Sequence, residues 1–223
     1  MKRIICLLTA VIFVFALVSC SEDDNVNTNY PSRTAAFYGT MGKDGFYFKM
    51  NFTNNGATYQ FTQATNGIVV TTIEDHKDNS KDGYYIFDGN ALHILDTANK
   101  RYNTIVGNVK AQGFLFEGYT PDMFANPNSS AVEQFEDASY YCETFSTVAT
   151  NGVTNGKNKY YFDGNQLKAV EIIEGGKTVM VMRFLEYSNE IPDGVYFAPP
   201  KGYKATTLQI EGSDIFYDDV FGK

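Results

Sequence analysis

The sequence has few histidines and cysteines and lacks the common catalytic motifs. Its 223 residues include no Trp, two His and three Cys. It has no G-x-S-x-G, H-E-x-x-H, P-loop or G-x-G-x-x-G pattern, which excludes common hydrolase, metalloprotease and nucleotide-binding sites. The net charge of -8 also argues against a nucleic-acid partner, which would require a basic stripe. We therefore expect a non-enzymatic protein with no cofactor, no bound metal and no nucleic acid.

The few residues with catalytic potential stand in unpromising places. His93 lies between Leu92 and Ile94 in a strand pattern, so we expect it to face away from the core, and His76 falls in a polar loop. Cys142 follows two tyrosines in another strand pattern, where a free Cys is usually a small buried hydrophobe and not a nucleophile.

One segment resembles half of a calcium-binding loop. Asp78–Gly83 has oxygen ligands at alternate positions and Gly at the sixth, but Gly89 occupies the twelfth position, where a bidentate Glu is required. A plain hairpin loop is therefore the favoured interpretation.

The N-terminus has the pattern of a secretory signal. Met1–Arg3 is positively charged, and Ile4–Val18 is apolar but too short to span a bilayer comfortably. Leu17–Cys20 resembles the lipobox of bacterial lipoproteins. The resemblance implies that residues 1–19 are removed and that an acylated Cys20 anchors the mature chain to a membrane. The alternative is an ordinary signal that is cleaved elsewhere, with Cys20 incidental.

Acidic residues follow this cysteine directly. Ser21, Glu22, Asp23 and Asp24 resemble the export signal of Bacteroidetes-type lipoproteins, which implies a place on the outer face of the outer membrane. Alternatively, they begin a solvated tether and the protein faces the periplasm. Residues 20–33 are predicted as a lipidated polar tether, and residues 34–223 as a single domain.

Removal of the signal changes the composition of the chain. The loss of Lys2 and Arg3 leaves 16 Lys and Arg against 26 Asp and Glu, a net charge of -10. Cys142 is then the one cysteine that is not lipidated, so no disulfide forms within the domain. Its stability must come from the hydrophobic core.

The domain has a β pattern in which short apolar segments alternate with turn residues. In Phe46–Phe52 the even positions are apolar and the odd ones mostly polar, as in a half-buried strand. We expect ten or eleven antiparallel strands. The predicted strands are Phe46–Phe52, Tyr59–Thr62, Ile68–Ile73, Tyr84–Phe87, Ala91–Leu95, Arg101–Val106, Tyr140–Val148, Tyr160–Phe162, Leu167–Ile173, Thr178–Tyr187 and Val195–Phe197.

One segment interrupts this pattern. Pro121 and Pro127 break the β signal, and Ser130 with Glu133 forms a capping-box sequence, which predicts a short helix over Ala131–Ala138. A helix near Thr34–Tyr38 is poorly supported by the sequence, because it would be short and Gly39 follows it.

The order of these elements resembles the LolA/LolB-like family of lipoprotein carriers. The resemblance is carried by Phe46–Phe52 with its hairpin, Tyr85–Asn90, Tyr161–Lys168 and the closing Tyr187–Tyr203. It implies a mainly antiparallel α+β fold, an incomplete β-barrel with one or a few short helices covering its concave face. No functional residue of the family is carried over to this chain.

Strands that are apolar on both faces complete the prediction. They need cover on both sides, and one side either lines a cavity for a hydrophobic or lipid ligand or belongs to a solid core. The predicted lining residues are Phe46, Phe48, Met50, Phe52, Phe61, Met180, Met182 and Phe184. The sequence thus predicts a membrane-anchored lipoprotein that binds such a ligand. The alternative is a cell-surface module that docks a protein or glycan through a Tyr-rich acidic surface.

A short modification signal lies in a predicted loop. Asp96-Thr97-Ala98 resembles the three-residue acceptor of O-glycosylation in Bacteroidetes, which makes Thr97 a candidate acceptor.

Overall fold

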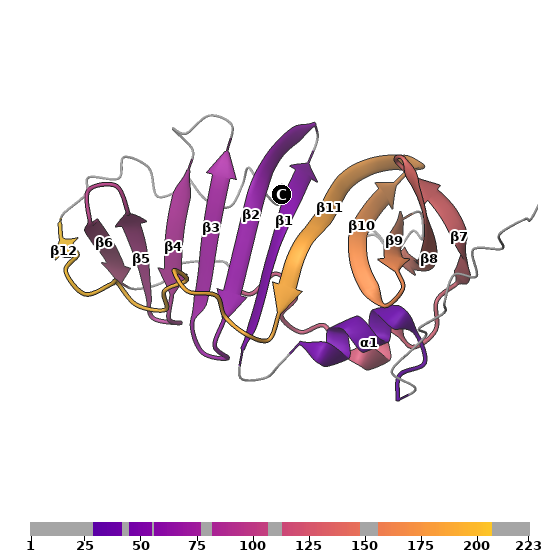
Figure 1. Ribbon diagram of the computed structural model, residues 1–223, viewed down its shortest axis with the longest axis horizontal. Coiled ribbons are helices and arrows are strands. Elements are labelled where there is room, and N and C mark those ends of the chain that lie inside the picture. Colours follow the sequence, from indigo (N-terminus) through magenta and orange to yellow (C-terminus); the bar gives the residue numbers. More distant parts are fainter. Residues whose placement is uncertain are drawn as a thin grey trace, which may run out of the picture.

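The domain is built on one open, mostly antiparallel β-sheet (Figure 1). The computed structural model describes residues 29–41, 45–54, 56–76, 82–106, 113–147 and 156–206. The strands in these ranges are β1 (Phe46–Asn54), β2 (Ala57–Thr65), β3 (Val70–His76), β4 (Gly83–Phe87), β5 (Ala91–Asp96), β6 (Arg101–Val106), β7 (Ser129–Phe135), β8 (Ala138–Thr147), β9 (Gly156–Asp163), β10 (Gln166–Glu174), β11 (Lys177–Ser188) and β12 (Lys204–Ala205).

The strand order brings the first and the eleventh strands together and leaves the sheet open. The order is β12-β6-β5-β4-β3-β2-β1-β11-β10-β9-β8-β7, so the first strand pairs with the eleventh in the middle of the sheet. Each neighbouring pair is antiparallel except β12 with β6, which is parallel. The two ends of the sheet do not pair with each other, which confirms the predicted incomplete barrel of mainly antiparallel strands.

The predicted helix over Ala131–Ala138 is wrong. Ser129–Phe135 is strand β7, which pairs along its whole length with β8 through a two-residue turn in which Glu136 has φ 53°. Glu133 forms an ion pair with Lys159 of β9 instead of capping a helix. Pairing with a neighbouring strand therefore outweighs the local capping signal.

The predicted strand at Val195–Phe197 is also wrong. Residues 191–203 contain turns and bends without strand pairing, and the chain forms a ladder again at β12. The reason lies in the composition, because Pro192, Pro199 and Pro200 lack the N–H groups that a ladder requires.

Two short helical segments lie beside the sheet. Helix α1 (Arg33–Thr40) begins after Ser32, whose hydroxyl accepts a hydrogen bond from the Ala35 amide, and the 3-10 turn η2 spans Pro121–Phe124. Helix α1 includes Thr34–Tyr38, where the sequence gives little support for a helix. Tyr30 and Ser32, within the range predicted as tether, already contact the folded domain.

The sheet has two wings that are covered on different faces (Figure 1). We call the face that bears Phe46, Phe48 and Met50 the inner face. The helix wing consists of β1, β2 and β8–β11, whose inner faces share one core with α1. The strap wing consists of β3–β6, whose outer face is crossed by the strap, residues 192–206.

Candidate ligand-binding face

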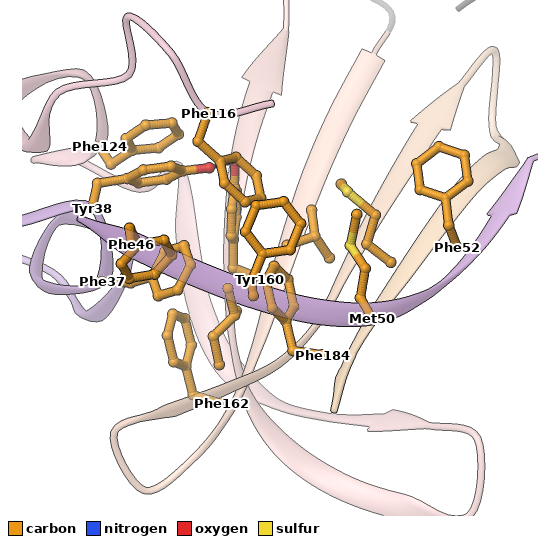
Figure 2. Packing of buried hydrophobic residues seen from close by; sticks show 14 of the residues in the cluster. Phe37, Tyr38, Phe46, Met50, Phe52, Phe116, Phe124, Tyr160, Phe162 and Phe184 are labelled. Carbon is orange, nitrogen blue, oxygen red and sulfur yellow. Dashed lines mark hydrogen bonds between the residues drawn. The ribbon is translucent and has the colours of Figure 1, made fainter. Parts of the chain in front are cut away.

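The eight predicted lining residues lie together on the inner face of the helix wing. Seven are buried in one hydrophobic cluster, and Met180 is partly buried against it. Figure 2 shows the rings of Phe37, Phe46 and Phe116 gathered near one end of β1, with Met50 and Phe52 farther along the strand. The exposed fraction of the seven buried side chains is 7% or less. Surface that a ligand can reach must therefore be sought elsewhere on the inner face.

Helix α1 and residues 113–124 cover the aromatic part of this core. The Phe37 ring of α1 packs edge-on against Phe46, Phe116 and Phe184, with centroids 5.7–6.2 Å apart. The Tyr38 ring stacks on Phe124 at 4.2 Å. Aromatic pairs at these separations add stability beyond the area they bury. This part of the inner face is a packed core.

A buried carboxylate fixes the helix in this position. Glu143 of β8 is 2% exposed, and its two oxygens accept hydrogen bonds from the Arg33 amide at 2.9 Å, the Thr34 amide at 2.8 Å and the Thr34 hydroxyl at 2.7 Å. The first amides of a helix lack partners within the helix, and its N-terminus favours negative charge. Glu143 therefore serves as a cap supplied by a distant strand.

A pair of tyrosine hydroxyls is sealed in the same core. The oxygens of Tyr38 and Tyr160 lie 3.3 Å apart. Burial raises the pKa of Tyr38 well above its usual value and that of Tyr160 to about 12. Both hydroxyls remain protonated at neutral pH, and their hydrogen bond joins α1 to β9 within the core.

The strap wing has its cover on the outer face. The Tyr84 hydroxyl accepts a hydrogen bond from the Tyr196 amide at 2.6 Å, and the Thr71 hydroxyl donates to the Tyr196 carbonyl at 2.5 Å. Tyr203 packs against the small cluster that Ile86 and Leu95 form beneath the strap. These contacts bury the outer face of the wing.

The inner face of the same wing carries an apolar row that is partly exposed to solvent. The strand register places four side chains directly opposite one another across β3–β6, namely Val70, Phe87, Leu92 and Ile105. Val70 and Phe87 are partly exposed, Leu92 is 9% exposed and Ile105 is 37% exposed. Opposed side chains share one face of a sheet. We call this set the apolar row.

Sequence reasoning missed the apolar row, although its local signal was available. Each of its members lies in a predicted strand, but the row exists only once the register of four strands is known. The next row toward the opposite strand ends is more polar and places Thr72, Tyr85, Ile94 and Asn103 side by side.

The other candidate residues fall outside this face. His93 lies on the outer side of β5, where Nδ1 is 2.9 Å from the Thr104 hydroxyl. Cys142 is buried in β8, and burial raises its pKa to about 11, which makes it a poor nucleophile. His76 is not in a loop as expected but ends β3. Thr97 is exposed in the β5–β6 turn.

Several predictions lie outside the described residues. These are the lipid attachment at Cys20, the export signal at Ser21–Asp24 and most of the calcium-loop segment Asp78–Gly83. The described ranges contain no group of three or more His, Cys, Asp or Glu side chains that could hold a metal ion. Helices in the same ranges are too short or too polar to cross a membrane.

The tyrosines of the described ranges differ in exposure, and seven of them are partly exposed. Tyr119 and Tyr196 are exposed, with 44% and 38% of their surface accessible. Six others are buried, namely Tyr38, Tyr47, Tyr59, Tyr84, Tyr160 and Tyr161.

Comparisons with known proteins give low similarity. No protein-family model and no curated protein matches the sequence. An uncharacterized conserved protein from Thermus thermophilus superposes with a TM-score of 0.45 and 4% identity, over 78% of this chain and 97% of that one. MucB superposes with a TM-score of 0.41 and 8% identity, over 74% of this chain and 60% of MucB. A Pseudomonas aeruginosa MucA/MucB complex matches with a TM-score of 0.41 and 9% identity, over 70% of this chain and 56% of that one.

Proposed function

We propose that this protein is a non-enzymatic lipoprotein that binds a hydrophobic or lipid ligand on the inner face of the strap wing. We further propose that the acylated Cys20 holds it on the outer membrane, facing the cell surface. The observation that carries the binding proposal is the apolar row, four strands wide and partly exposed on the sheet.

The dimensions of the row fit an acyl chain. Three strand spacings separate Val70 from Ile105, a span of about 14 Å, along which about ten methylenes of an extended chain would lie. Each buried methylene contributes about 0.8 kcal/mol of transfer free energy. The neighbouring row is more polar and ends at Asn103, two residues before Ile105 on the same face of β6, so a polar group of the ligand would lie on that side of the chain.

Binding is tested with a charge placed in the row. The Ile105→Glu substitution puts a carboxylate where the chain would lie, and desolvation of that charge should weaken binding of a fluorescent fatty-acid analogue about tenfold or more. Val132→Glu is the matched control, because Val132 is 72% exposed on β7, the strand at the opposite edge of the sheet. Native mass spectrometry of the purified parent should also detect co-purified lipid. Equal binding by both variants, or none by the parent, would refute the proposal.

Membrane anchoring is tested separately. Cys20→Ala should release the protein from membranes, whereas Cys142→Ala, at the buried cysteine, should leave it attached. Replacing Glu22, Asp23 and Asp24 with Ala should preserve attachment and abolish digestion by protease added to intact cells. Retention of the Cys20→Ala protein in the membrane fraction would contradict the anchor, and protease resistance of the parent would contradict the surface location.

A further inference from the structure

Two exposed apolar side chains stand beside the point where the predicted tether joins the domain. Tyr119 is 44% exposed and Met123 is 59% exposed. Tyr119 lies just before the 3-10 turn η2, and Met123 lies within it. We call these two side chains the η2 patch.

The η2 patch is attached to the core by ring contacts and by the chain. The Tyr119 ring packs edge-on against Tyr38 at 5.3 Å and Phe124 at 5.7 Å. Met123 precedes Phe124, whose ring stacks on Tyr38 in the core. Their exposure is therefore a feature of an ordered surface and not of a loosely held loop.

The N-terminal segment meets the domain at the same place. The Ser32 hydroxyl donates a 2.6 Å hydrogen bond to the carbonyl of Phe124, the residue after Met123. Tyr30 lies against Gly39, the neighbour of Tyr38 in α1. The first described residues of the chain thus lie next to the η2 patch.

The length of the preceding chain limits how far this surface lies from the lipid. Tyr30 is the tenth residue after Cys20, and a chain of that length reaches at most about 36 Å. A domain held this closely presents the surface around its tether to the bilayer. Tyrosine favours the headgroup region, where its ring is apolar and its hydroxyl is solvated.

We propose that the η2 patch rests on the lipid surface and orients the domain on the membrane. This inference rests on the acylated Cys20 proposed above. Glu117 and Asp122 lie beside the patch, so the contact should be stronger with neutral than with anionic lipid. Membrane contact at this point leaves the β1–β2 hairpin tip, about 27 Å along β1 from Phe46, directed away from the bilayer.

The absence of Trp makes a direct test available. Tyr119→Trp and, in a second variant, Met123→Trp each introduce the sole indole of the lipidated chain. Lys177→Trp is the control, because Lys177 is exposed at the start of β11, three residues before Met180, which pairs with Asn54 at the far end of β1. Each protein is reconstituted on phosphatidylcholine vesicles with and without brominated phosphatidylcholine, and vesicle flotation is measured in parallel.

Brominated lipid should quench the indole at positions 119 and 123 several-fold more strongly than at position 177. A fraction of phosphatidylglycerol in the vesicles should reduce that quenching. If the proteins float with the vesicles and neither patch position is quenched more than position 177, the orientation is refuted while the anchor stands. If the lipidated chain does not float, the anchor and the orientation are both refuted.

Discussion

One row of opposed side chains runs across both wings of the sheet, and it is buried in the helix wing but partly exposed in the strap wing. Beyond Val70, the apolar row continues through Thr65 of β2 to Phe46 of β1. Phe46 is 1% exposed beneath α1, whereas Phe87 in the strap wing remains partly exposed. The helix covers the inner face of one wing, and the strap covers the outer face of the other. An apolar sheet face needs a partner, and the described residues cover the inner face of the strap wing less completely than that of the helix wing.

The largest expected effect compares two phenylalanines of this row. Phe46→Ala should lower the free energy of unfolding by about 3–5 kcal/mol, because it leaves a cavity among Phe37, Phe114 and Tyr187. Phe87→Ala should cost only about 1–2 kcal/mol, since part of that ring is already in water. Urea denaturation of both variants measures the difference. Equal losses would mean that the strap wing is packed as tightly as the helix wing.

The next effect concerns the residue that keeps the helix wing covered. Glu143→Gln replaces one carboxylate oxygen with an NH₂ group, which then faces an amide or hydroxyl donor. This should lower the free energy of unfolding by about 1.5–3 kcal/mol. Amides of α1 should exchange faster, and a dye that binds exposed apolar surface should bind more strongly, as the helix wing comes to resemble the strap wing.

The control for this variant is Glu174→Gln, at an exposed glutamate of β10, which should leave stability and dye binding unchanged. If the Glu143 variant behaves like this control, packing of the aromatic rings alone holds the helix in place.

A smaller effect is expected in the strap. Tyr84→Phe removes the hydroxyl that accepts a hydrogen bond from the Tyr196 amide and donates one to the Gly194 carbonyl. The loss should lower the free energy of unfolding by about 1 kcal/mol. Hydrogen exchange at the Tyr196 amide should accelerate. Tyr196→Phe is the matched control because it leaves these backbone hydrogen bonds intact. Unchanged exchange in the Tyr84 variant would show that apolar contacts secure the strap without this hydroxyl.

The sequence was sufficient to predict elements whose signal is local. The alternation in Phe46–Phe52 predicted β1, and the even positions of that segment do lie in one core. The same local reasoning failed where distant partners decide the conformation. The Ser130–Glu133 pattern is overridden by pairing of β7 with β8, and α1 depends on Glu143, more than 100 residues away.

The predicted lining residues and the open apolar row lie in different wings for a related reason. Periodicity identifies which side chains share a face, but the cover over that face comes from elsewhere in the chain. Phe46 is buried by Phe37 and Phe114, and Ile105 remains exposed although it is also apolar. A sequence read strand by strand contains no measure of that cover, which depends on tertiary contacts.

The smallest expected effect is a change in the pKa of one carboxyl, that of Asp96 at the β5–β6 turn of the strap wing. Asp96 accepts hydrogen bonds from the Arg101 guanidinium at 2.5 Å and from the Asn99 side chain at 2.8 Å, and these contacts lower the pKa of the Asp96 carboxyl to about 2. A carboxyl whose pKa falls on folding stabilises the protein above its unfolded pKa of about 4, and that contribution is lost as the pH drops toward 2.

An NMR titration of the Asp96 carboxyl should therefore give a midpoint near pH 2 in the parent and a higher one in Arg101→Gln. The affinity of the apolar row for a fatty-acid analogue should not change, because the substitution affects the turn and leaves Val70, Phe87 and Leu92 untouched. A midpoint that stays near pH 2 would assign the shift to Asn99. A loss of ligand binding would instead show that the turn and the apolar row form one site, and the strap wing would then differ from the helix wing in offering a charged group next to its open apolar surface.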